Sequence, residues 1–314
     1  MSKLSTVWVF SDAASRLPEL VAGGARYGEV VSVFVIGSAD DVKSAFTAGA
    51  STVYHLGDKD PARIIEDYAD TMAKTIAEGG KPSLVLLPAN RRGKALASKL
   101  GAKLQAGVVT EASELVVEAD GILARHMVYG GLAIGEDRVM SPVAVATVGS
   151  GVFEAAPADA SRTGETVSVA FVQPKHPIRC VERRAKQVSS VDLAKAKRVV
   201  GVGRGISQKE DIAIAEALCG AIGAELGCSR PIAESEKWME HERYIGVSGN
   251  MISPDFYVAV GISGQIQHMV GANGAHTIFA INKDKNAPIF ESADYGIVGD
   301  LYTIVPALVS ALKG

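Results

Sequence analysis

The feature that most constrains the fold is a regular alternation of short β-branched runs with longer amphipathic stretches. In the first half of the chain, apolar runs that predict strands occur at residues 6–10, 30–36, 51–56 and 84–87. Stretches that predict helices follow them at residues 16–27, 39–48, 61–78 and 94–104. Runs that are apolar throughout are typical of strands buried between two layers of helices in a parallel sheet. The pattern therefore predicts an α/β fold.

Between this half and the last third of the chain, the pattern changes. Residues 113–117 and 121–128 predict an antiparallel ribbon, and residues 142–172 continue as strands and loops. Residues 173–186 are rich in Pro and Arg, have neither periodicity, and predict a linker. Beyond it, strands are predicted at residues 198–202, 224–227, 256–260 and 277–281, and helices at 209–222, 265–270 and 306–312.

The length of the chain suits two domains. Its 314 residues are enough to bury two hydrophobic cores. We therefore predict two α/β domains, residues 1–187 and residues 188–314, each a mainly parallel sheet flanked by helices.

Charge and hydropathy exclude several classes of partner. The 32 Lys and Arg residues nearly balance 35 Asp and Glu residues, which argues against a nucleic acid or an anionic membrane surface as partner. No apolar run approaches the length of a membrane span, and residues 1–10 lack the pattern of a secretory signal. We expect a cytoplasmic protein with no membrane span.

No metal site is expected. Cys180, Cys219 and Cys228 lack the CxxC spacing of metal ligands, and the six histidines are scattered. The cysteines are predicted to be buried small apolar residues. A basic cluster, Arg179, Arg183, Arg184 and Lys186, is interpreted as a face of the linker.

Two predicted strands break into glycines where a helix follows. The first break, VVGVGRGI at residues 199–206, lets the backbone approach a ligand closely. It lacks the full GxGxxG spacing and a following acidic residue, so a tight turn without a ligand explains it equally well. The sequence NRRGK at residues 90–94 lacks the second glycine of a phosphate loop and is interpreted as a solvated helix start.

The second break, YVAVGISGQIQH at residues 257–268, is more informative. Free backbone N–H groups and the positive end of the helix dipole make such a turn a phosphate site. Ser263 adds a hydroxyl there, and Gln267 and His268 lie about one turn into the helix, where they can reach the edge of a ring. A purely structural role for His268 remains an alternative.

Residues 199–314 resemble the FAD domain of the electron-transfer flavoprotein α subunit. The resemblance rests on VVGVGRGI, CSRPIAE, GVSG, YVAVGISGQIQH, TIFAINKD, APIF and ADYGIVGDL. In the first domain, LVLLPANRRGKALASKL and MVYGGLA resemble the same family. The family implies a Rossmann-like, FAD-binding second domain. WMEHERYIGVSG is similar to the FixB-type bacterial branch, whose members serve anaerobic carnitine reduction or nitrogen fixation.

The resemblance implies contacts of this chain with the flavin ring. Ser229 and Arg230 match the family's Ser-Arg pair, with Arg230 over the isoalloxazine. A planar guanidinium stacks on an aromatic face and favours extra electron density there; a surface pair with Glu234 is the alternative. In the family's GQTG loop, Ser248 keeps the hydroxyl expected near flavin N5 and Gly249 the final glycine, whereas Val247 replaces the amide.

The remaining implied contacts hold the rest of FAD. Ser263 and the backbone around it hold the pyrophosphate, through Gly261, Ile262, Gly264 and Gln265. His268 donates toward the flavin C2 carbonyl, beside Gln267. Asn282 contacts the ribityl or adenylate portion, and Asp300 and Leu301 contact adenine. A turn-capping role for Asn282, a helix N-cap for Asp300 and a packing role for the turn of Arg204, a further implied contact, are the alternatives.

The family also implies a role and partners. No acid/base pair and no nucleophile motif is present, which fits an electron carrier rather than an enzyme. The implied partners are an electron-transfer flavoprotein β subunit, with which the chain forms a heterodimer, and redox proteins resembling acyl-CoA dehydrogenases or quinone oxidoreductases. The main rival function is an NAD(P)-dependent oxidoreductase, because glycine turns also suit nicotinamide cofactors. A non-catalytic nucleotide sensor is a third interpretation.

Overall fold

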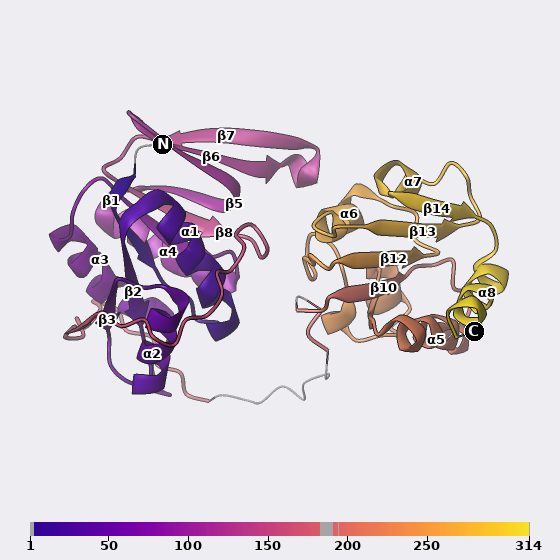
Figure 1. Cartoon of the computed structure of the whole chain (residues 1–314), viewed down its shortest axis with the longest axis horizontal. Helices are drawn as coiled ribbons and strands as arrows, with labels where there is room; N and C mark the ends of the chain where they lie inside the picture. The colour runs from indigo at the N-terminus through magenta and orange to yellow at the C-terminus, as the bar shows by residue number, and fades with distance from the viewer. Residues whose placement is uncertain (1–2, 183–190, 194, 314) are drawn as a thin grey trace. The chain divides into compact units, whose positions relative to one another are not determined.

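The computed structural model describes residues 3–182, 191–193 and 195–313 and divides them into two compact units (Figure 1). One unit contains residues 3–128 and 134–182, and the other contains residues 129–133 together with the described residues from 191 onward. The predicted domain boundary between residues 187 and 188 lies outside the described residues, as do Arg183, Arg184 and Lys186 of the basic cluster. That boundary stays a prediction.

A nine-stranded mixed sheet forms the centre of the first unit, in the order β7-β6-β5-β8-β4-β1-β2-β3-β9. The pairs from β5 through β8, β4, β1, β2 and β3 to β9 are parallel, whereas β5 and β6 are antiparallel. The strands are β1 (Leu4–Val9), β2 (Gly28–Val35), β3 (Thr52–His55), β4 (Ser83–Pro88), β5 (Gly107–Glu118), β6 (Gly121–Val128), β7 (Ala133–Val139), β8 (Val143–Val148) and β9 (Glu165–Ser168).

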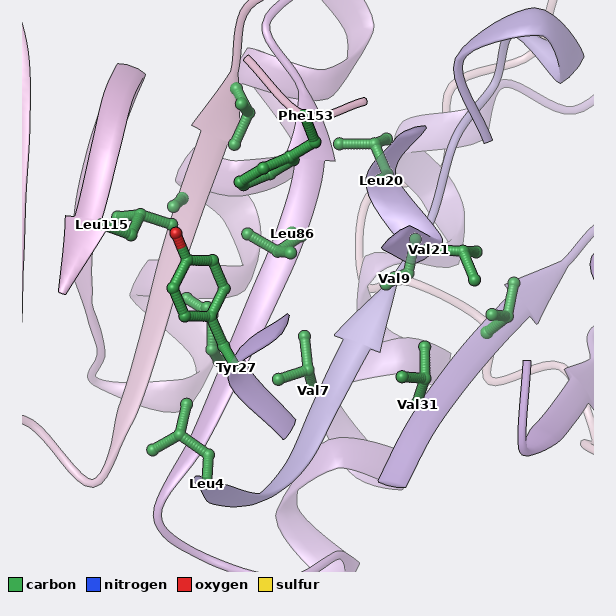
Figure 2. Packing of buried hydrophobic residues seen from close by; sticks show 14 of the residues in the cluster. Leu4, Val7, Val9, Leu20, Val21, Tyr27, Val31, Leu86, Leu115 and Phe153 are labelled. Atoms are coloured by element: carbon green, nitrogen blue, oxygen red, sulfur yellow. The ribbon is translucent and has the colours of Figure 1, made fainter. Parts of the chain in front are cut away.

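Helices cover both faces of this sheet, so its central strands are buried on both sides. Val7 and Val9 of β1 pack in one hydrophobic cluster, with Leu20 and Val21, as Figure 2 shows. Trp8, between them, belongs to the cluster on the opposite face. This two-sided burial is why the strands are apolar throughout rather than alternating. The helices are α1 (Leu17–Tyr27), α2 (Ala39–Ala48), α3 (Ala69–Glu78) and α4 (Arg91–Leu104).

The second unit is built on a five-stranded, fully parallel sheet in the order β11-β10-β12-β13-β14. The strands are β10 (Arg198–Val202), β11 (Glu225–Cys228), β12 (Phe256–Val260), β13 (Ile278–Asn282) and β14 (Tyr295–Val298). The helices are α5 (Ile212–Ile222), α6 (Ile266–Ala272), α7 (Ile289–Ser292) and α8 (Leu301–Lys313). Together the two sheets confirm the predicted α/β fold.

The order of these strands places a topological switch point between β10 and β12. From β10 the chain turns to one side to form β11, and it then returns to form β12 on the other side of β10. The connections that leave β10 and β12 therefore diverge, and a crevice opens beyond the carboxyl ends of the two strands. Both glycine breaks of the sequence lie at this edge, since they follow β10 and β12 directly.

Two predicted helices begin five or more residues from the predicted start. The helix predicted at residues 61–78 does not include Pro61, because the Asp60 side chain accepts a hydrogen bond from Ala62 N and holds a turn. A short 3-10 turn, η2 (Ile65–Tyr68), precedes α3 instead. The helix predicted at residues 306–312 begins at Leu301 and contains Pro306 within it. Strands β7 and β14 and the short α7 were not predicted.

Two of the three cysteines are buried as predicted. Burial raises the pKa of the Cys219 and Cys228 thiols to about 12, whereas Cys180 is only half-buried, which differs from the prediction. Across the described ranges, every helix falls short of the length and apolar character that crossing a membrane requires.

Candidate functional site

A pocket of about 600 Å³ lies at the switch point of the second unit. The turns after β10, β11, β12 and β13 and the start of α8 line it. Most of the site residues predicted from the sequence face this one pocket: Arg204, Ser229, Arg230, Gly261, Ile262, Ser263, Gln265, Gln267, His268, Asn282, Asp300 and Leu301. Segments that are about 100 residues apart in the sequence thus converge on a single site.

Three predicted residues support the pocket without lining it. Ser248 makes a 3.2 Å hydroxyl–hydroxyl contact with Tyr244, which does line the pocket. Gly249 closes a turn against the same tyrosine, since a Cβ there would lie 2.4 Å from the Tyr244 carbonyl oxygen. Gly264 has φ +82°, and a Cβ there would lie 2.2 Å from Ile289 N in α7. These positions hold the walls of the pocket in place.

The two glycine breaks touch each other through backbone atoms. Gly203 N donates to Val260 O at 2.9 Å, and Gly205 N donates to Gly261 O at 2.9 Å. A Cβ on Gly205 would lie 2.6 Å from Gly261 Cα, a distance that real side chains do not tolerate. The turn of Arg204 therefore has a packing role, which the sequence left open, and it also borders the pocket.

A run of unpartnered backbone N–H groups lies at the same pocket, which Ile262, Ser263 and Gln265 of the run line. Within the described residues, the N–H groups of residues 262–265 donate no hydrogen bond, although Ile262 and Gly264 are buried. Buried backbone donors are almost always satisfied. Consecutive N–H groups before a helix form a concave site for an anion. The turn after β12 is therefore suited to a phosphate group.

His268 supplies a second unpartnered polar atom. The side chain is only 7% exposed, and its Nε2 lies 2.8 Å from the hydroxyl of Tyr257. Its Nδ1 is buried and has no hydrogen-bond partner in the described part of the chain. Burial lowers the pKa of His268 to about 4, and the nearby backbone of Ile245 opposes this shift in part, although its geometry does not make it a hydrogen-bond partner of Nδ1. The imidazole is therefore neutral at pH 7.

Comparison with known proteins covers nearly the whole chain. A family model described as the electron transfer flavoprotein FAD-binding domain matches residues 192–273, and one described as the electron transfer flavoprotein domain matches residues 16–174. Protein FixB from Escherichia coli strain 55989 is 58% identical over 312 residues, which cover 99% of each chain. Protein FixB from Escherichia coli O9:H4 strain HS gives the same identity and coverage.

The chain belongs to the electron-transfer flavoprotein family, as a FixB-type α subunit. It is an electron carrier that works with FAD, and its second unit contains the family's FAD-binding domain. The family pairs such an α subunit with a β subunit. The predicted family, cofactor and carrier role are confirmed.

The residues at the switch point fit FAD. The unpartnered N–H groups of residues 262–265 suit a pyrophosphate, and the unpartnered Nδ1 of His268 suits a polar atom of the flavin ring. Glycine turns leave room for close approach of the backbone. The pocket is thus complementary to a dinucleotide in its polar groups.

Arg230 is the predicted contact of the ring face. It lines the pocket just before a short π-helix, η5 (Pro231–Ser235), and its Nε donates to Glu234 Oε2 at 2.6 Å. The guanidinium side chain is 65% exposed, so it remains accessible from the pocket. The pairing with Glu234, which was the alternative interpretation of Arg230, is present. It does not remove the planar face of the guanidinium.

Two further residues that were predicted to contact the cofactor also form hydrogen bonds within the protein. Asn282 donates from Nδ2 to Ile262 O at 2.9 Å and accepts from Asp284 N at 3.0 Å. Asp300 accepts from Tyr302 N at 3.1 Å before the first turn of α8. Turn capping and helix capping, both raised as alternatives, are therefore seen at these positions. Since both residues also line the pocket, capping and binding are compatible.

Sequence reasoning missed several lining residues, including Ser207, Lys283 and Tyr302. The hydroxyl of Tyr302 accepts from Ser207 N at 2.8 Å and donates to Asp211 at 2.7 Å. It therefore ties the turn after β10 to α8. Ser207 and Tyr302 lie one residue beyond the quoted motifs, whereas Lys283 lies inside TIFAINKD, where a contact was assigned to Asn282 alone.

Proposed function

We propose that FAD lies in this pocket with its pyrophosphate on the turn after β12. The main support is that unpartnered backbone N–H groups and an unpartnered imidazole nitrogen border one pocket at a topological switch point. The flavin ring lies against Ser229, Arg230 and Gln267, with Ser248 reaching it from behind Tyr244. Asn282 contacts the middle of the cofactor, and Arg204, Asp300 and Leu301 contact its adenylate end.

FAD supplies one-electron transfer, and the protein sets the potential at which it occurs. Arg230 places a permanent positive charge beside the ring and thereby favours added electron density. His268 donates a hydrogen bond from a site that excludes water, where such a bond is stronger than in solution. Neither group transfers a proton to a substrate, which is consistent with a carrier.

The site requires a second polypeptide in this proposal. The β subunit covers the outer side of the flavin, and the heterodimer exchanges electrons with proteins that resemble acyl-CoA dehydrogenases or quinone oxidoreductases. The 58% identity with Escherichia coli FixB over nearly the whole chain supports a FixAB-type system in the cytoplasm. Such systems serve anaerobic carnitine reduction or nitrogen fixation.

An absorption spectrum tests the cofactor site, and a deletion tests the pathway. Co-expression with the β subunit should yield a yellow heterodimer with about one FAD in this chain's pocket. A colourless protein that binds NADH would instead support the NAD(P)-dependent rival.

Deletion of the gene should abolish either anaerobic growth that depends on carnitine or growth on dinitrogen. Normal growth under both conditions would exclude both pathways.

A further inference from the structure

Tyr257 is a fully buried polar residue that does not line the pocket. It lies on β12, just before the turn that borders the pocket, and its side chain is 0% exposed. Its hydroxyl lies 2.8 Å from His268 Nε2, the one hydrogen bond this hydroxyl makes among the described residues. The two rings are tilted by 35° with centroids 6.2 Å apart.

On the side that faces β10, there is no room for a water molecule to form a hydrogen bond with this hydroxyl. A Cβ on Gly201, which lies on the neighbouring strand β10, would be only 2.3 Å from the Tyr257 oxygen. The hydroxyl is thus packed against the backbone of β10. Burial also raises the pKa of Tyr257, so the hydroxyl keeps its proton at neutral pH.

These contacts determine the direction of the hydrogen bond. A buried hydroxyl must donate its proton to an acceptor or lose the free energy of that bond. The acceptor within reach is Nε2 of His268, which must then carry no proton. A neutral imidazole has one N–H group, so its proton is on Nδ1. Nδ1 is the nitrogen that has no partner within the described chain.

We propose that Tyr257 is a positioning residue that fixes the proton of His268 on Nδ1 and so makes this nitrogen a donor toward the flavin. The inference deepens the proposed function and rests on His268 lying against the cofactor. A tyrosine that never touches FAD thereby controls one of its hydrogen bonds. This arrangement follows the general behaviour of histidine, in which the partner of one ring nitrogen decides the protonation of the other.

The tautomer can be observed directly by NMR. The full chain, labelled with ¹⁵N-histidine and prepared without flavin, gives two-bond ¹⁵N–¹H correlations that differ between the two neutral tautomers. His268→Gln identifies the signal of His268 among the six histidines. At pH 7 the wild-type chain should show the proton on Nδ1, and Tyr257→Phe should move part of the population to Nε2. A proton on Nε2 in the wild-type chain would overturn the proposal, whether or not the variant folds.

A double-mutant cycle on the FAD-loaded heterodimer tests the effect on the cofactor. In the wild-type background, Tyr257→Phe should lower the one-electron reduction equilibrium constant of the flavin about tenfold, which is about 59 mV for one electron. In the His268→Gln background, the same change should alter the constant less than about twofold, because the effect of Tyr257 passes through the imidazole. Equal shifts in the two backgrounds would refute this coupling.

Tyr295→Phe is the matched control. It removes a hydroxyl from the same sheet, at a side chain that is 66% exposed and outside the pocket lining. It should change neither the tautomer of His268 nor the potential. A heterodimer without FAD would count against the proposed function, while the tautomer measured in the flavin-free chain would still decide the role of Tyr257.

Discussion

Arg230 donates from Nε to Glu234 Oε2 at 2.6 Å, so the guanidinium proposed to lie on the flavin is already held by a carboxylate four residues further along the chain. The pairing orients the side chain, and it also offsets part of the positive charge that acts on the ring. The two residues therefore influence the flavin in opposite directions.

Replacement of Arg230 by Ala should lower the first one-electron potential of the bound flavin. The side chain is 65% exposed and paired, so solvent and Glu234 both reduce its effect. We expect a fall of about 60 mV, a tenfold change in the one-electron equilibrium. Lys should recover part of it, because an ammonium keeps the charge but does not stack as a plane. Spectroelectrochemical titration of the heterodimer measures these shifts.

Glu234→Gln is the control for this prediction. It removes the offsetting negative charge, so the potential should stay at or above the wild-type value. A shift below about 20 mV in Arg230→Ala with FAD still bound, about a twofold effect, would show that another residue supplies the charge beside the ring.

The chain should retain FAD better with its β subunit than alone. The proposed flavin site is completed by the second polypeptide, whose absence leaves the ring exposed to solvent. Gel filtration of the isolated chain and of the co-expressed heterodimer, followed by the ratio of flavin to protein absorbance, makes the comparison. Equal retention in the two preparations would argue that this chain holds the cofactor unaided.

His268 should make the flavin-free chain less stable as the pH falls. Its pKa is about 4 in the folded chain and about 6.5 when unfolded, so the unfolded state binds a proton that the folded state does not. The contribution of His268 to the free energy of unfolding is fully present above pH 6.5, and about 2 kcal/mol of it should be lost between pH 7 and pH 5. In His268→Gln this part of the loss should vanish. Urea unfolding of both chains across this pH range measures it, and identical slopes would contradict the burial of a neutral imidazole.

Gly205→Ala should separate the two glycine turns. The new Cβ would lie 2.6 Å from Gly261 Cα, where backbone rather than a flexible side chain must move. Overpacking of this kind costs about 1–3 kcal/mol, and FAD retention should fall with it, because the phosphate turn shifts. Thermal unfolding and flavin content report the two effects.

Gly220→Ala is the matched control for that substitution. Gly220 lies in α5, and nothing lies within 4 Å of its added Cβ. Alanine in a helix interior is favoured over glycine by about 0.5–1 kcal/mol, so this variant should be slightly more stable and keep its flavin. If both variants lost FAD equally, the contact between the turns would not be the cause.

The strands around the site were predictable because they are buried on both faces. Strands β10 and β12 occupy the residues predicted for them, and the glycines that follow mark where each chain segment leaves the sheet. Strand β7 was missed because charged residues interrupt it and most of its residues are exposed, and β14 was missed because its exposed run is only four residues long. The start of α8 was placed at Pro306, although Asp300, which was raised as a helix N-cap, caps the helix five residues earlier at Leu301.

The parts of the candidate site that lie in a backbone turn were predictable from the sequence. The parts that depend on a contact between distant residues were less predictable. Glycines, Ser263 and His268 appear in one continuous motif. Tyr302 reaches the site through hydrogen bonds to residues about 95 positions earlier, which no local pattern encodes. The hydrogen-bond partner of His268 was likewise not predicted, because the sequence around Tyr257 has the pattern of an ordinary buried strand.

The direct contact between the turns of Gly205 and Gly261 separates anchoring of the dinucleotide from adjustment of its redox chemistry. In the proposed site, anchoring depends on main-chain atoms of these turns, whereas the driving force for electron transfer depends on the side chains of Arg230, His268 and Tyr257. An engineer can therefore vary the latter on an unchanged scaffold and obtain a graded series of carriers.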